Sequence, residues 1–319
     1  MSILALFLDG VGLNTDRTNT NPFVAADLPQ LGHFMDPNRW LSETSITSTR
    51  CSTFIPLDAC LNVKGVPQSA TGQATLLTGI NAPEVLGEHY GPKPNDALRA
   101  FLNQGTVVSR LVAAGKRVAL LNAYPEEYLQ ALKKGVRVPS SIQQAFVGAD
   151  VALFGAGDLL AGDALSLDFS GEMWHTPTFA HRAAKVMWRA DLNEERVPLL
   201  SPYEAGQRLA GLCRRYDFSL FDHWLTDYIG HRGTVEQAAG WLEVLDQVIA
   251  GLLSTWNRDD DTLILISDHG NIEDFSVSGH TTNPVPCLVV GKNHGDITSG
   301  PQDLTALTPF VSRLLGISH

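Results

Sequence analysis

Short apolar runs alternate with amphipathic stretches along most of this chain. The first run, Ile3 to Leu8, ends at Asp9-Gly10 and predicts a buried strand followed by a turn. The same pattern predicts further strands at 118–121, at 218–225 and in the segment TLILIS. Helices are predicted before Gly115, from a Ser201 cap onward, and at about 235–255. Strands that alternate with helices favour a mostly parallel sheet covered on both faces, so the pattern predicts an α/β fold.

The middle of the chain, residues 124–198, breaks this alternation. The segment is rich in Trp, Arg and His, and its helices and strands are hard to assign from the pattern. We expect a small inserted cap here, between a first part of the core at 1–123 and a second part at 199–319. The first part also contains a helix predicted from Ser69 to Thr78, which stops at Gly79.

Composition and charge narrow the range of functions. Of the 319 residues, 44% are hydrophobic and 18% are charged, which is typical of a globular chain. The net charge of −11 argues against a nucleic-acid partner, because phosphate backbones attract basic surfaces. The four cysteines lack the spacing of a zinc site or a disulfide framework. No apolar run approaches the roughly 20 residues that span a bilayer, and no signal-like segment precedes the first strand, so we expect a cytoplasmic protein with no membrane partner. The oligomeric state stays open.

Acidic and histidine side chains follow three of the predicted strands. Asp9 comes directly after the first strand, Asp227 follows the strand that begins at Phe218, and Asp268-His269 follow TLILIS. Asp9 alone would also fit an ordinary Asp-Gly turn. In open parallel sheets, however, ligands bind beyond the carboxyl ends of the strands, so these residues are expected to meet at one edge of the sheet.

Ser69, His231 and His280 extend this group from other segments. A serine at a helix start is commonly only an N-cap, but the positive helix end also favours an ionised nucleophile or a phosphoryl oxygen. His231 stands four residues after Asp227, so one helical turn would place both on a common face; an exposed pair is the alternative. His280 lies in a loop with Gly279 and two threonines, where a buried core histidine is not expected.

Together these side chains supply the donors that two neighbouring divalent cations and one nucleophile require. Carboxylates, imidazoles and a hydroxyl suit Zn²⁺ or Mn²⁺, and two such ions can clamp an in-line displacement at phosphorus. The sequence therefore predicts dinuclear metal-dependent phosphoryl transfer on a small phosphorylated substrate. The candidate residues are Asp9, Ser69, Asp227, His231, Asp268, His269 and His280.

The segments that carry these residues resemble those of the alkaline phosphatase superfamily, most closely the branch of cofactor-independent phosphoglycerate mutase and phosphopentomutase. The resemblance rests on SATGQATLLTG, DYIGHRG, SDHGN and HTTNPVP, in the flanks 1–123 and 199–319. It implies a three-layer sandwich with a mostly parallel central sheet and a small inserted cap. It places Ser69 at the position of the phosphorylated residue. It also implies one metal ion held by Asp227, His231 and His280, and a second held by Asp9, Asp268 and His269 with the Ser69 oxygen.

The resemblance does not decide the reaction. Gln73, a candidate substrate contact, stands where these mutases usually carry a histidine or asparagine, and Arg232 resembles a phosphopentomutase residue. The arginine-rich substrate signature of phosphoglycerate mutase is not found in the expected cap, which is much shorter than that enzyme's. The short cap favours net hydrolysis, by a phosphatase or phosphodiesterase, over an intramolecular mutase. Basic residues of the cap either bind substrate or form a solvated helix face: Arg182, Lys185, Arg189 and Arg196.

Three other interpretations are less favoured. The segment VALFGAGDLL imitates a dinucleotide-binding loop but lacks the third glycine and the later acidic residue. A non-catalytic metal-binding relative would be expected to have lost ligands, whereas the whole set is present here. Sulfatases need a C/S-x-P-x-R context, which does not surround Ser69.

Overall fold

A central β-sheet organises the computed structural model, which describes residues 1–33, 45–175, 178–189 and 196–318. Its strand order is β2-β3-β9-β8-β1-β7-β4. The first strand, β1 (Ile3–Leu8), lies between β7 (Phe218–His223) and β8 (Thr262–Ser267) and runs parallel to both. Beside β7, β4 (Val118–Leu120) continues the parallel half of the sheet. The strands predicted from the apolar runs therefore form the centre of the fold.

The other half of the sheet alternates in direction. β9 (Val285–Gly291) is antiparallel to β8, β3 (Ser52–Leu57) is antiparallel to β9, and the short β2 (Thr47–Ser48) is antiparallel to β3. Because two reversals restore the direction, β3 points the same way as the four parallel strands, so five of these seven strands share one direction. The predicted α/β fold with a mostly parallel sheet is confirmed, although the pattern did not predict β2, β3 or β9.

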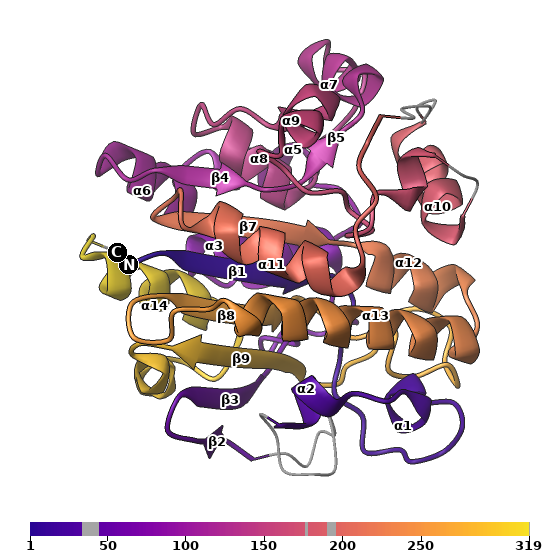
Figure 1. The fold of residues 1–319 in the computed structure, drawn as a ribbon. Helices are drawn as coiled ribbons and strands as arrows, with labels where there is room; N and C mark the ends of the chain where they lie inside the picture. Colours follow the sequence, from indigo (N-terminus) through magenta and orange to yellow (C-terminus); the bar gives the residue numbers. More distant parts are fainter. Residues whose placement is uncertain (34–44, 176–177, 190–195, 319) are drawn as a thin grey trace.

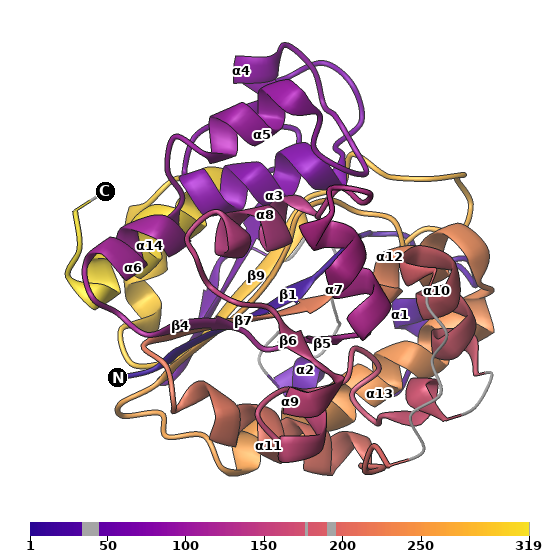
Figure 2. The same ribbon diagram turned by 90° about the horizontal axis from the view of Figure 1, so that it is seen from above.

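Helices cover both faces of the sheet (Figures 1 and 2). Alternate residues of β1 belong to two apolar clusters: Leu4, Leu6 and Leu8 face one way, and the odd-numbered residues face the other. The first face is covered by α11 (Pro202–Cys213) and α13 (Val235–Ser254). The opposite face is covered by α3 (Ser69–Thr78), α6 (Val107–Ala113) and α14 (Leu307–Leu315). The molecule is thus a three-layer α/β/α sandwich.

Shorter helices complete the layers. Two of them, α1 (Pro22–Ala25) and α2 (Pro29–His33), pack against α13, and α4 (Ala82–Leu86) and α5 (Asp96–Leu102) pack beside α3. Outside residues 124–198, the remaining elements are α12 (Leu225–Arg232) after β7 and the 3₁₀ turns η2 (His294–Ser299) and η3 (Leu304–Ala306). Among the residues described above, no helix combines the length and apolar character needed to cross a lipid bilayer.

Local sequence sets the ends of the main helices. The hydroxyls of Ser201 and Thr234 cap α11 and α13 through reciprocal capping boxes, as expected for such residues. Gly79 ends α3 with φ of 72°, a left-handed conformation that glycine adopts without strain. The start of α3 differs from the N-cap interpretation. Gln68 occupies the cap position and Ser69 is already helical, so the Ser69 hydroxyl is free of a capping role.

The described parts of 124–198, residues 124–175, 178–189 and 196–198, lie over the β4–β7 side of the sheet (Figure 1). They contain a two-residue pairing of β5 (Ala123–Tyr124) with β6 (Phe154–Gly155), the turn η1 (Glu172–Trp174), and helices α7 (Glu126–Lys133), α8 (Ser141–Val147), α9 (Ala156–Ala161) and α10 (Phe179–Trp188). Buried aromatic rings of this segment join the apolar cluster that contains Ile3. Because β6 pairs outside the central sheet, the dinucleotide-loop alternative lacks its supporting strand. The division into core and cap stays a prediction.

Candidate metal centre

The candidate metal ligands and Ser69 meet beyond the carboxyl ends of the parallel strands. Asp9 follows β1, and Asp268-His269 follow β8 directly. Asp227 and His231 lie one turn apart on α12, which begins two residues after β7 ends. Ser69 opens α3, and His280 lies in the loop before β9. The fold thus brings together residues from four separate segments, because His280 lies in the same β8–β9 loop as Asp268 and His269.

One group of ligands surrounds His269. Its Nε2 lies 3.2 Å from Asp9 Oδ1, 3.7 Å from Asp268 Oδ2 and 3.0 Å from Ser69 Oγ. Asp268 and His269 are completely buried, and Asp9 and Ser69 are nearly so. The serine oxygen therefore shares a small, buried space with two carboxylates and an imidazole.

A second group adjoins the first. Asp227 lies 3.4 Å from His231 Nε2 and 3.5 Å from His280 Nε2, and these two nitrogens are 3.1 Å apart. The rings of His269 and His280 stack with their centroids 3.8 Å apart. His231 is the most exposed member, since 38% of its side chain is accessible. The two groups predicted from the resemblance are therefore neighbours, and their roles as ligands stay a prediction.

The donor atoms permit one grouping that the resemblance does not include. Ligand atoms of Asp9, Asp268 and His269 lie within 4.8 Å of one another, and so do those of Asp227, His269 and His280. His269 thus stands between the two groups and is close enough to contribute to either. Spacing in the sequence cannot show that His269 lies between the two groups, because its position depends on how the His269 and His280 rings stack.

The imidazoles are oriented for metal binding by their second nitrogens. Nδ1 of His280 lies 2.9 Å from the Pro67 carbonyl oxygen, and Nδ1 of His269 lies 3.2 Å from that of Gly270. A carbonyl only accepts, so in both rings Nδ1 carries the proton and donates. Nε2 is then directed at the carboxylates, which is the usual arrangement behind a metal-bound histidine.

The electrostatics of the centre call for a cation. Burial and the neighbouring Asp268 raise the pKa of Asp9 to about 8, and burial also raises the pKa of Asp268 to about 6. Burial opposes a charged His269, yet Asp268 and Asp9 raise its pKa to about 10. Burial and His269 lower the pKa of His280 to about 4. Asp9 Oδ1, although 3.2 Å from His269 Nε2, is also a buried oxygen without a hydrogen-bond partner among the described residues. Oxygen and nitrogen donors in this arrangement fit divalent cations such as Zn²⁺ or Mn²⁺.

One buried carboxylate, which the sequence interpretation missed, joins two of the loops that carry these residues. Glu273 is completely buried and accepts from Gly12 N at 2.9 Å and Asn271 N at 2.7 Å. Its other oxygen accepts from Thr281 Oγ1 at 2.5 Å and Asn283 Nδ2 at 3.1 Å. The two ends of the β8–β9 loop are thereby fixed to each other and to the loop after β1. The only sequence signal was an acidic residue shortly after SDHGN.

Close approach of backbone segments also shapes the centre. Gly10 has φ of 69°, and a Cβ there would come within 2.6 Å of Asp227 Oδ1. Glycine at this position therefore lets α12 bring Asp227 against the turn after β1. Asn271 completes the contact by donating to Asp227 Oδ1 at 2.6 Å.

The predicted substrate contacts are spread over two places. Gln73 lies inside the centre, where its Nε2 donates to Asp9 Oδ2 at 3.3 Å and to Asp268 Oδ2 at 3.4 Å. Arg232 is exposed at the end of α12. Arg182 and Lys185 are exposed on α10, and Arg189 follows that helix. Arg196 lies outside the helices and strands. A substrate role for these basic residues stays a prediction.

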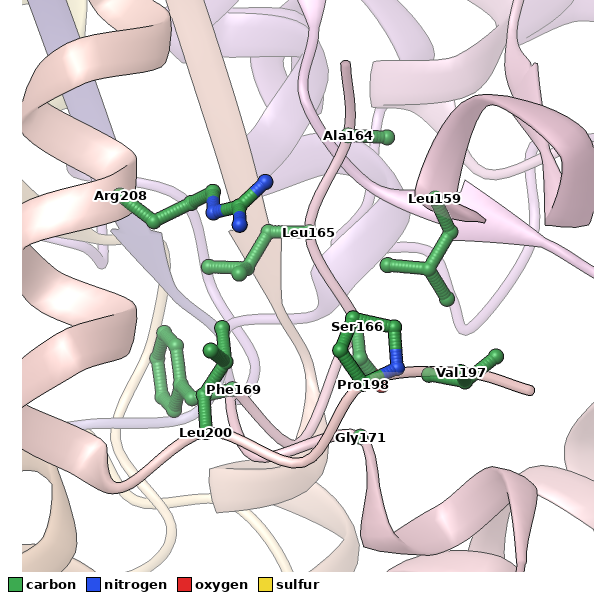
Figure 3. Close-up of a pocket in the computed structure, with 10 residues that line it drawn as sticks. All are labelled: Leu159, Ala164, Leu165, Ser166, Phe169, Gly171, Val197, Pro198, Leu200 and Arg208. Carbon is green, nitrogen blue, oxygen red and sulfur yellow. The ribbon is translucent and has the colours of Figure 1, made fainter. Parts of the chain in front are cut away.

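Two cavities differ in what they could hold. The cavity in Figure 3 lies between α9, α11 and residues 164–171, away from the candidate ligands, and its volume of about 10 Å³ has room for about one water molecule. An open pocket of about 350 Å³ adjoins Ser69 instead. It is lined by residues 64–66 and 68 and by residues 88–91, and the latter loop packs against the start of α3. Only the second pocket is large enough for a small metabolite.

The fold and the centre together define an α/β protein with a buried carboxylate–imidazole site at the carboxyl edge of its sheet. Residues 199–309 match the model of the Metalloenzyme superfamily. The chain therefore carries a domain of this alkaline-phosphatase-like superfamily.

The chain is also similar to curated relatives in sequence and to solved structures in fold alone. The 2,3-bisphosphoglycerate-independent phosphoglycerate mutase of Rhodopseudomonas palustris is 24% identical over 288 residues, which cover 78% of this chain and 56% of the relative. That of Clostridium botulinum is 29% identical over 129 residues, covering 38% of this chain and 25% of the relative. The chain thus spans about a quarter to about half the length of these relatives. Two solved alkaline phosphatases share the fold. That of the Antarctic bacterium TAB5 has a TM-score of 0.54 and 11% identity, and the match covers 100% of this chain and 98% of that one. That of a psychrophilic Shewanella has a TM-score of 0.52 and 12% identity, and the match covers 99% of this chain and 100% of that one.

Proposed function

We propose that this chain is a phosphoryl-transfer enzyme that uses two divalent metal ions and Ser69 to hydrolyse the phosphate ester of a small metabolite. The observation that carries the proposal is the position of Ser69 Oγ. It lies 3.0 Å from His269 Nε2, within a buried group of carboxylates and imidazoles. A hydroxyl that serves neither as a helix cap nor in the apolar core, and that faces such a group, is suited to act as a nucleophile.

The chain's own groups favour attack by this oxygen. Ser69 is the first residue of a ten-residue helix, so the positive end of the helix dipole lies at its hydroxyl and favours an ionised oxygen. When bound, divalent cations would add Lewis acidity that stabilises this charge and the charge of the phosphoryl group. Ser69 Oγ would form a bond to phosphorus while the ester oxygen leaves with a proton as the free alcohol. Water would then cleave the phosphoserine and release inorganic phosphate.

An intramolecular phosphomutase is the second candidate. It is favoured by the curated relatives described above, which are phosphoglycerate mutases. In that reaction the phosphoserine would return its phosphoryl group to another hydroxyl of the same substrate molecule, instead of passing it to water.

A metal-depletion experiment tests the shared part of both candidates. A chelator should abolish hydrolysis of an aryl phosphate, and added Mn²⁺ or Zn²⁺ should restore it, because the ligand set accepts both ions. Activity that survives complete removal of metal would overturn the proposal. A screen of phosphorylated sugars, glycerates and nucleotides then separates the candidates: release of phosphate indicates a hydrolase, and an isomer formed without release indicates a mutase.

A further inference from the structure

The side chain of Gln73 contacts both acidic residues of one ligand group, although it is not itself a candidate ligand. It stands on α3 four residues after Ser69, so the two side chains lie about one helical turn apart on the same side of the helix. Only 3% of Gln73 is exposed. The side chain therefore offers almost no surface to a substrate, and the contact predicted from the sequence needs another interpretation.

The amide group of Gln73 joins the carboxylates of Asp9 and Asp268. Its Nε2 donates to Asp9 Oδ2 at 3.3 Å and to Asp268 Oδ2 at 3.4 Å. The amide nitrogen has two hydrogens, one for each carboxylate, and an ionised carboxylate only accepts. The other oxygen of Asp268 accepts from Gly10 N at 3.3 Å. The Gln73 amide thus fixes the rotation of both carboxyl groups.

This arrangement leaves one carboxylate oxygen available to a cation. Asp9 Oδ1 lies 3.2 Å from His269 Nε2 and has no hydrogen-bond partner among the described residues. Donor atoms of Asp9, Asp268 and His269 lie within 4.8 Å of one another. Because the second oxygen of Asp9 is held by Gln73, the free one is directed at the other members of this group.

The helix that carries Gln73 is a rigid support. All ten residues of α3 are buried, and α5, α8 and α14 pack against it (Figure 2). From α8, Ser141 Oγ donates to Ala70 O at 2.8 Å. A Cβ on Gly72 would lie 2.9 Å from Asp268 O, so glycine lets α3 approach the end of β8 closely. The Gln73 amide is therefore held at a fixed place beside the carboxylates.

We propose that Gln73 is a positioning residue for the divalent cation held by Asp9, Asp268 and His269. The proposal rests on the metal-dependent function proposed above. The amide holds one oxygen of each carboxylate and so presents both groups to the cation in one orientation. In the described structure its hydrogen bonds go to Asp9 and Asp268 and not to the group around Asp227. The effect is therefore confined to one of the two ions.

The unpaired end of the amide argues against a purely structural role. A glutamine that only stabilised the fold would be expected to use its acceptor as well as its donors, since buried polar groups are almost always paired. Here the donors reach candidate ligands, whereas Gln73 Oε1 has no partner within the described residues. This pattern is expected of a side chain whose orientation is set by the ligands that it positions.

Metal titration of a glutamine variant tests the proposal. Gln73→Met keeps the length and bulk of the side chain but has no amide. When the chelator-treated protein is titrated calorimetrically with Mn²⁺, we expect one of two equivalents to bind about tenfold more weakly or worse, and the other to bind unchanged. Gln144→Met is the matched control and should bind both equivalents normally. It makes the same change on α8, at a half-buried glutamine whose amide donates to Asn103 Oδ1 at 3.2 Å.

Double variants assign the effect to one ligand group. In an Asp268→Asn background, Gln73→Met should weaken binding little further, because a ligand that it orients is already altered. In a His231→Asn background the full loss should remain, because the effects of groups without shared partners add. Urea unfolding checks that each variant is folded. Gln73→Asn, whose amide is one carbon atom shorter and cannot reach both carboxylates, is a second variant that should show the same selective loss.

The outcomes separate this proposal from the proposed function. If the unaltered chain binds no Mn²⁺, the metal-dependent function fails. If it binds Mn²⁺ and both Gln73 variants bind it as tightly, Gln73 does not position ligands and the function stands. Equal weakening of both equivalents would show a general loss of structure, and would also overturn the positioning role.

Discussion

Two buried polar regions border the nucleophile, and they differ in how completely their hydrogen bonds are satisfied. Both Glu273 oxygens accept hydrogen bonds from the loops around the metal centre, four bonds in all. In the neighbouring region, Asp222 Oδ1 and Arg137 Nη2 have no hydrogen-bond partner among the described residues. A satisfied buried carboxylate stabilises a fixed arrangement, whereas an unsatisfied buried charged group costs free energy. The comparison separates a region that stabilises the site from a region that destabilises the fold.

The largest expected effect is at Ser69, which lies between the two regions. Ser69→Ala removes the only proposed nucleophile, so turnover of an aryl phosphate should fall by about a thousandfold or more. Steady-state kinetics measure this, with Ser299→Ala, an exposed serine in η2, as the control. Full activity in Ser69→Ala would mean that another group attacks phosphorus.

Substituting a candidate ligand should lower the amount of bound metal more when that ligand is more deeply buried. Asp268 is completely buried, whereas 38% of the His231 side chain is exposed. Asp268→Asn should therefore lower the bound manganese more than His231→Asn, because water can replace the exposed ligand more easily. Elemental analysis of the dialysed proteins measures both. Unchanged metal content in Asp268→Asn would count against the ligand set.

In the region where hydrogen bonds are satisfied, Glu273→Ala should lower the stability of the fold. Four buried donors would lose their acceptor, so the free energy of unfolding should fall by about 3 kcal/mol or more. Metal affinity should fall by roughly tenfold or more, because the loops that hold the ligands are no longer fixed to one another. Urea unfolding and calorimetry give the two quantities. A variant as stable as the wild type would show that the loops do not depend on Glu273.

Substitution of Asp222, in the region with unpaired charged groups, should raise the free energy of unfolding rather than lower it. In the metal-free protein the pKa of Asp222 is raised from 3.8 to about 7, so ionisation is disfavoured in the folded state. Between these two values the unfolded chain loses the proton first, and the folded state is penalised increasingly as pH rises. Asp222→Asn should therefore gain stability relative to the wild type by about 2 kcal/mol between pH 4 and pH 8. Urea unfolding at both pH values tests this, and a difference that does not vary with pH would contradict it.

The central strands and the positions of the candidate ligands at their ends were predictable because each depends on local sequence. β1 and β8 are uninterrupted apolar runs, and Asp9 and Asp268 follow them directly. β3 and β9 were missed because Pro56, Pro284 and Pro286 hide their strand pattern, and because antiparallel strands need no intervening helix. β7 ends at His223 rather than at Leu225, since Trp224 already begins the turn into α12.

Residues that act through tertiary contacts were not predictable. Glu273 and Asn271 bind to groups far away in the sequence, and nothing in their spacing indicates which loops they join. Asp222 lies inside an otherwise apolar strand, and its bonds to the Asn122 side chain join residues 100 positions apart. The placement of His269 between two ligand groups depends likewise on packing of rings, not on sequence distance.

The number of metal ions bound by the intact chain tests the central claim most directly. Calorimetric titration of chelator-treated protein with Mn²⁺, checked by elemental analysis, should give two equivalents per chain. The same titration of Asp268→Asn should give fewer. Protein that is folded but binds no divalent cation, or binds it equally well without Asp268, would contradict the account.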